Sequence, residues 1–77
     1  MDKPQWQLLE WYRGCPIEHR PGMQRRGYRL VYHNSVGIIT MVHYTADKCR
    51  HQCDRLHSRL GGQVEVPEQA YSEWKQP

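Results

Sequence analysis

Cysteine and histidine residues in this sequence are spaced so that their side chains could bind a metal ion. Cys15 and His19 lie four residues apart, and Cys49 and Cys53 have the same separation further along the chain. Thiolate and imidazole groups are the ligands that tetrahedral zinc takes in proteins. These four residues therefore define one hypothesis, a zinc-stabilised small domain. The alternative, which we favour, is that the thiols are small apolar core residues and that no cofactor is bound, because the tight Cys-x-x-Cys knuckle is missing.

Arginine side chains with neighbouring tyrosines form a second candidate site. Basic charge is concentrated early in the chain, since five Arg and one Glu lie between residues 13 and 29. Guanidinium groups bind phosphates and flat rings stack on bases, which is the combination that RNA and single-strand binders use. A helix expected further along adds more cations. The candidate partner-binding residues are Arg20, Arg25, Arg26, Tyr28, Arg29, Tyr32, Arg55 and Arg59.

The sequence lacks the patterns of an enzyme and of a membrane-spanning protein. It contains no Gly-rich phosphate loop, paired-carboxylate arrangement or other catalytic motif, so we predict no catalytic residues. No run approaches the roughly 20 apolar residues that span a bilayer, and the first residues do not have the pattern of a signal peptide. The three cysteines are an odd number, which suits a reducing compartment. We therefore expect a cytoplasmic protein with no membrane partner.

Two stretches have clear secondary-structure patterns. Residues 28–44 contain two runs rich in β-branched and aromatic residues with turn formers between them, which predicts an antiparallel β-hairpin. Residues 46–60 place Cys49 and Cys53 on one apolar stripe and basic residues on another, which predicts an amphipathic helix. The hairpin has apolar residues on both faces and therefore needs cover on both sides.

The flanking stretches have weaker patterns. Residues 5–12 fit a helix or a strand, and we favour the helix. Residues 14–27 are basic and rich in Pro and Gly, which predicts a long loop. Residues 63–66 alternate as a short strand, and residues 67–77 form a tail.

The predicted fold class is α+β, within a single domain that covers residues 1–77. An N-terminal helix (or strand) and the long loop precede a ββαβ unit, in which an antiparallel sheet packs on one amphipathic helix. Over residues 28–66 this order resembles, in architecture alone, small accessory proteins encoded by phages and mobile elements, which bind host machinery and inhibit or redirect it.

These observations lead us to expect a small non-enzymatic binding module that docks on a host protein and modulates it. The expected target belongs to the machinery that handles nucleic acid, and the expected source is a phage or mobile element. The three Trp and five Tyr support protein binding, because aromatic residues and Arg are enriched at interface hot spots. The alternatives are direct RNA or single-stranded DNA binding through the arginine-rich loop, and the zinc-stabilised domain. A homodimer would also cover the open hairpin edge.

Overall fold

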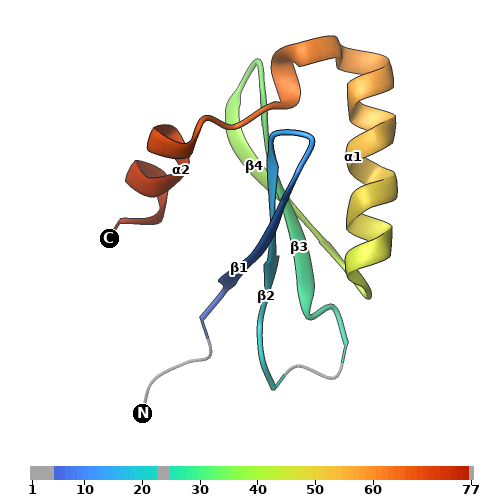
Figure 1. Cartoon of the computed structure of the whole chain (residues 1–77), viewed down its shortest axis with the longest axis vertical. Helices are drawn as coiled ribbons and strands as arrows, with labels where there is room; N and C mark the ends of the chain where they lie inside the picture. Colours follow the sequence, from blue (N-terminus) through green and yellow to red (C-terminus); the bar gives the residue numbers. More distant parts are fainter. Residues whose placement is uncertain (1–4, 23–24, 77) are drawn as a thin grey trace.

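The computed structural model describes residues 5–22 and 25–76 and places them in one four-stranded antiparallel sheet with two helices (Figure 1). The strands are hydrogen-bonded neighbours in chain order, so β1 and β4 are the two edges. The elements in order are β1 (Gln7–Tyr12), β2 (Cys15–His19), β3 (Tyr28–Asn34), β4 (Gly37–His43), α1 (Ala46–Leu60), the 3-10 turn η1 (Gly61–Val64) and α2 (Glu68–Lys75).

The α+β class is confirmed, and so are the hairpin and the long helix. β3 and β4 pair antiparallel from Tyr28 opposite His43 to Asn34 opposite Gly37. α1 begins after Thr45, whose hydroxyl accepts a hydrogen bond from the Lys48 backbone N–H at 3.1 Å. The predicted ββαβ order is not found, since the observed order is four strands followed by two helices.

The N-terminal third differs from the prediction, because residues 7–12 form a strand rather than a helix and the predicted loop contains β2. Arg13 and Gly14 join β1 to β2 with φ angles of 50° and 80°. Positive φ at both central residues is typical of the tight turns whose twist fits a hairpin. Pro16 lies before the first residue of β2 that pairs with β3, Ile17, so its missing N–H removes no hydrogen bond from that ladder.

The C-terminal third also differs, because residues 63–66 do not form a strand and the tail contains α2. Val64 is buried with α1 on one face of the sheet, and Val66 is buried on the other face. The buried valines of this segment therefore alternate with exposed residues because the chain passes from one face of the sheet to the other between Val64 and Val66. The Val66 N–H donates to the Gly14 carbonyl at 2.9 Å and fixes this crossing at the β1–β2 turn.

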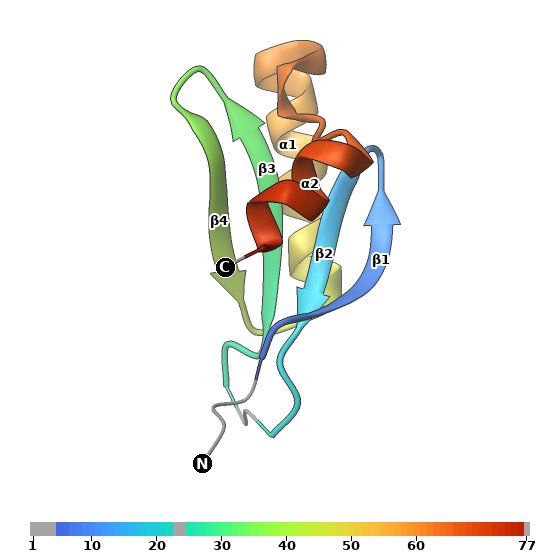
Figure 2. The same cartoon turned by 90° about the vertical axis from the view of Figure 1, so that its left-hand side faces the viewer.

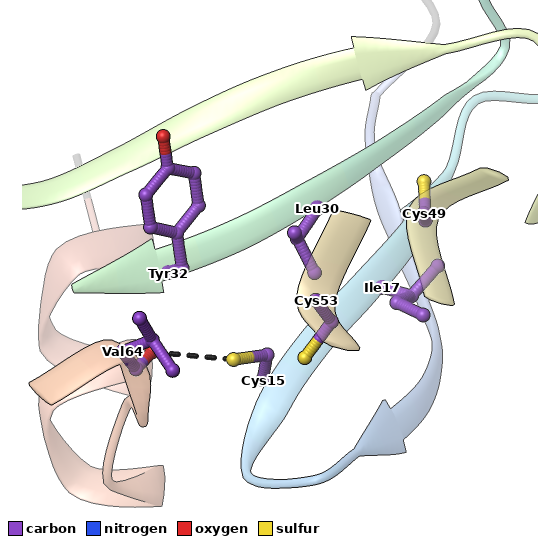
Figure 3. Close-up of a cluster of buried hydrophobic side chains, with 7 residues drawn as sticks. All are labelled: Cys15, Ile17, Leu30, Tyr32, Cys49, Cys53 and Val64. Carbon is purple, nitrogen blue, oxygen red and sulfur yellow. Dashed lines mark hydrogen bonds between the residues drawn. The ribbon is translucent and has the colours of Figure 1, made fainter. Parts of the chain in front are cut away.

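Each face of the sheet is covered by one helix, as Figure 2 shows with α2 in front of the sheet and α1 behind it. Alternate residues of a strand point to opposite faces, so Leu30 and Tyr32 belong to the α1 side and Val31 to the α2 side. Seven buried residues form the core beneath α1, namely Cys15, Ile17, Leu30, Tyr32, Cys49, Cys53 and Val64 (Figure 3).

Candidate functional site

A groove of about 300 Å³ opens between α1 and the end of β4. The residues that α1 contributes recur at intervals of three and four, and they therefore lie along one flank of the helix. We call this surface the basic groove, and the residues that line it are His43, Lys48, His51, Gln52 and Arg55.

The cations of the basic groove are not neutralised within the described part of the chain. Neither Lys48 nor Arg55 has a carboxylate partner among the ion pairs of these residues. His51 has one, because its Nε2 lies 3.8 Å from Asp47 Oδ2, but both side chains are about three-quarters exposed. Screening by water makes such an exposed contact weak. The groove therefore presents positive charge to solvent.

His43 adds an unpartnered nitrogen to this groove. Its Nε2 is buried and has no hydrogen-bond partner among the described residues. Burial lowers the pKa of His43, and the neighbouring positive charge of Lys48 lowers it further, so the imidazole is neutral near pH 7. A buried polar atom without a partner costs free energy, and a ligand that supplied one would recover it.

The opposite flank of α1 has a similar number of charges, and they are paired. The Arg50 guanidinium lies 2.7 Å from Glu10 Oε1 on β1, and the Arg13 guanidinium lies 2.8 Å from Asp54 Oδ1. The Arg13 guanidinium lowers the pKa of the Asp54 carboxyl, and a hydrogen bond from the Tyr12 hydroxyl lowers it further. These charges stabilise the contact between α1 and the β1–β2 hairpin.

Several of the predicted partner-binding residues extend the basic groove. Arg55 lines it, and Arg59 lies one turn further along α1 and is exposed. Arg25 and Arg26 are also exposed, in the connection that leads into Tyr28, and Tyr28 pairs with His43 across the hairpin. The loop arginines and the groove therefore lie at the same end of the sheet.

The aromatic rings at this end are partly available. The Arg26 guanidinium lies 6.0 Å from the centre of the Tyr44 ring, and Tyr44 is 55% exposed. Tyr28 stacks on His19 with 4.7 Å between ring centres and is half-buried. The sequence analysis did not select Tyr44, although its position directly after a strand that ends beside the basic loop was a usable signal.

Three of the predicted residues point elsewhere. Tyr32 is only 6% exposed and lies in the α1-side core, so its ring offers no stacking surface. Arg29 lies on the α2 side, with its guanidinium 4.6 Å from the centre of the Trp6 ring and 5.4 Å from that of Trp74. Arg20 also approaches Trp6, at 5.8 Å, and its Nε is buried. None of these three side chains is therefore among those that line the basic groove.

A buried carboxylate on the α2 side was missed by sequence reasoning. Glu18 is fully buried in β2, and it accepts hydrogen bonds from Arg29 Nε, from the Tyr71 hydroxyl and, at 2.7 Å, from Lys75 Nζ. Burial alone would raise the pKa of Glu18, but the bonds from Lys75, Tyr71 and Arg29 outweigh burial and hold it below its usual value. We call these four residues the Glu18 cluster.

Cysteines and histidine do meet, but not as the zinc hypothesis predicted. The ligand atoms of Cys15, Cys53 and His57 all lie within 4.8 Å of one another, and we call these residues the thiol cluster. Cys49 is buried one helical turn before Cys53, and His19 stacks on Tyr28 at the far end of β2, so neither belongs to the cluster found among the described residues. The predicted set of four ligands is therefore not brought together.

The two thiols of the cluster are hydrogen-bonded. Cys15 Sγ donates to the Val64 carbonyl at 3.2 Å and Cys53 Sγ donates to the Tyr12 carbonyl at 3.5 Å (Figure 3 shows the first). The neighbouring Cys53 thiol raises the pKa of Cys15, and burial raises it further, whereas the neighbouring Cys15 thiol lowers the pKa of Cys53. Cys53 is therefore the cysteine that more readily becomes a thiolate.

Known proteins do not identify these sites. No family model, curated protein or solved structure matches this chain. Among the described residues, no helix has the length and apolar character needed to cross a membrane. The function has to be argued from the geometry of the basic groove, the Glu18 cluster and the thiol cluster.

Proposed function

We propose that the protein is a small non-enzymatic binding module that holds single-stranded RNA or DNA along the basic groove. The observation that carries this proposal is the uncompensated charge of Lys48 and Arg55, with the exposed Arg25 and Arg26 near the His43 end of the groove. A positively charged groove beside an exposed aromatic ring is the usual arrangement of proteins that bind single strands. Tyr44 supplies such a ring.

The roles of the residues follow from their positions. Lys48 and Arg55 lie about two helical turns apart on one flank and contact phosphates of the strand. Arg25 and Arg26 extend the charge beyond the groove and steer the approach of the polyanion. The neutral His43 ring accepts or donates one hydrogen bond at the floor of the groove, where its Nε2 is without a partner in the described structure.

Docking on a host protein, the expectation that the sequence favoured, has less support from the geometry. Its proposed anchors were aromatic side chains, and the three tryptophans contact other side chains of the fold, although Trp74 is still 36% exposed. The ring centres of Trp11 and Tyr71 are 5.3 Å apart, those of Trp74 and Tyr71 are 6.1 Å apart, and Trp6 packs on Arg29. Modulation of a host protein, a phage origin and a homodimer therefore remain predictions from sequence.

The test compares two double variants that remove the same number of charges from opposite flanks of α1. Lys48→Gln/Arg55→Gln removes the groove cations, and Arg13→Gln/Arg50→Gln removes the cations paired with Asp54 and Glu10. Binding to a labelled single-stranded oligonucleotide is followed by fluorescence anisotropy over a range of salt concentrations.

We expect the groove variant to weaken binding by about tenfold or more, the equivalent of at least about 1.4 kcal/mol. The slope of log K against log salt should fall by about 0.7 for each phosphate contact that is lost. The paired-flank variant should retain most of the wild-type affinity and slope. Equal losses in the two variants would show that only net charge matters and would overturn the groove as the binding site. Affinity that does not change with salt would overturn nucleic-acid binding itself.

A further inference from the structure

We infer that Cys15, Cys53 and His57 form a binding site for a thiophilic divalent cation such as zinc, separate from the basic groove. Two sulfur atoms and one imidazole nitrogen lie within 4.8 Å of one another. Metal–ligand bonds of about 2.0 to 2.3 Å put tetrahedral ligands roughly 3.3 to 3.8 Å apart. A contraction of at most roughly 1.5 Å therefore gives three corners of a zinc tetrahedron.

The backbone already holds the three ligands from two rigid elements. Cys53 and His57 are four residues apart on α1, so their side chains lie on the same side of the helix. Cys15 is the first residue of β2, where the tight turn at Arg13 and Gly14 brings the chain beneath α1. The two thiols are buried in the described structure. When they bind a metal ion, each loses its proton to solvent and the metal takes the place of that proton.

A hydrogen bond to the backbone sets the tautomer of His57. Its Nε2 lies 2.8 Å from the Arg13 carbonyl oxygen, and because a carbonyl only accepts, Nε2 carries the proton. The other nitrogen, Nδ1, then keeps its lone pair free for a metal. A ligand histidine that donates its second N–H to a backbone carbonyl is the common outer-shell arrangement, because this bond fixes the tautomer and the ring orientation.

The fourth position of the tetrahedron is open to solvent or to a carboxylate. His57 is only half-buried, which gives a metal ion a path to the two buried sulfur atoms. The Glu65 side chain lies over the β1–β2 turn, since a Cβ at Gly14 would be 2.7 Å from Glu65 Cγ. The donor set of two sulfurs and one nitrogen with an open position suits zinc better than magnesium or calcium, which prefer oxygen ligands.

Cobalt(II) added to the reduced full-length protein tests this site, because thiolate coordination gives a near-ultraviolet charge-transfer band and tetrahedral geometry gives intense visible bands. We expect one cobalt per chain, displacement by zinc, and a melting temperature that rises with zinc concentration. Absence of the charge-transfer band in the reduced protein would overturn the proposal.

Matched variants separate the ligands from their neighbours. Cys53→Ala and Cys15→Ala should lose the charge-transfer band, whereas Cys49→Ala, at an equally buried cysteine of the same helix, should keep it. His57→Gln should weaken cobalt binding at least tenfold and His51→Gln should not. His57 lies outside the buried core, so this pair stays informative if a cysteine variant fails to fold. Equal cobalt binding by His57→Gln and His51→Gln would show that the His57 imidazole is not a ligand.

Discussion

The Glu18 cluster and the basic groove both gather cations, but they use them differently. In the Glu18 cluster, Arg29 and Lys75 are tied to a fully buried carboxylate between the sheet and α2. In the basic groove, Lys48 and Arg55 have no carboxylate partner among the described residues and face solvent. The charges of the Glu18 cluster therefore hold the fold together, whereas those of the basic groove remain available for an anionic partner.

The largest effect on stability is expected from Glu18→Ala. Removing one partner of a buried ion pair typically costs about 3 to 5 kcal/mol, because the charge left behind loses its compensation, and here that charge is mainly the guanidinium of Arg29, whose side chain is 17% exposed. Arg29 would retain only its packing against Trp6 and Trp74, and Lys75 would lose its carboxylate. Urea denaturation followed by circular dichroism measures the change.

The control for this variant is Glu73→Ala, which removes an exposed glutamate from α2 itself. Its free energy of unfolding should stay within about 0.5 kcal/mol of wild type, as is usual for surface substitutions. If Glu18→Ala were no more destabilising than Glu73→Ala, the buried network would not be what fixes α2 to the sheet.

The contribution of Glu18 should also depend on pH. Its folded pKa lies below its ordinary value of 4.5, so the folded state favours the carboxylate and the unfolded state binds more protons as the solution is acidified. The stability that Glu18 adds is therefore complete above pH 4.5 and is lost as the pH falls through the folded pKa.

The measurement compares the unfolding free energies of wild type and Glu18→Gln from neutral to acidic pH. We expect the difference between the two proteins to be constant at neutral pH and to shrink below pH 4.5. A difference that stays the same into strong acid would contradict an ionised Glu18.

A smaller dependence of the same sign, in a higher pH range, belongs to the groove, at His43. Its folded pKa lies below the ordinary 6.5, with Lys48 beside it and His51 and Arg55 lining the same groove. The folded state therefore disfavours the imidazolium, and wild type should lose stability as the pH falls below 6.5. Thermal unfolding of His43→Gln at neutral and mildly acidic pH should show a smaller loss than wild type. Identical pH profiles would mean that His43 ionises freely in the folded protein.

The smallest effect on stability is expected in the basic groove, where Lys48 and Arg55 have no carboxylate partner among the described residues. Lys48→Gln/Arg55→Gln should change the free energy of unfolding by less than about 0.5 kcal/mol, because it breaks no ion pair of the described structure. Chemical denaturation of this variant and of Glu18→Ala compares how much the two regions contribute to the free energy of unfolding. A marked loss of stability would show that the groove cations support the fold after all.

Sequence reasoning was most successful where the pattern is local. The hairpin of residues 28–44 and the helix of residues 46–60 are both found, because their apolar periodicity and turn residues act over a few positions. β2 was missed because Gly14 and Pro16 are also typical of loops. Here Gly14 completes a tight hairpin turn, and Pro16 lies outside the β2–β3 ladder.

The sites depended on contacts that no local pattern encodes. Glu18 looked like a loop glutamate, because its partners Tyr71 and Lys75 are 53 and 57 residues away in the chain. The cysteine spacing raised the hypothesis of a site with Cys15 and Cys53 but did not favour it, and only the crossing of β2 beneath α1 brings His57 rather than His19 to these thiols. The groove required knowledge of which flank of α1 faces β4.

The long separation between Glu18 and its partners has a consequence for synthesis on the ribosome. The strands and α1 emerge first, and at that stage the Glu18 carboxylate on β2 has only Arg29 of its three hydrogen-bond partners. Only when α2 has left the exit tunnel can Tyr71 and Lys75 close over it. The nascent chain should therefore stay protease-sensitive until α2 is complete and become resistant in one late step.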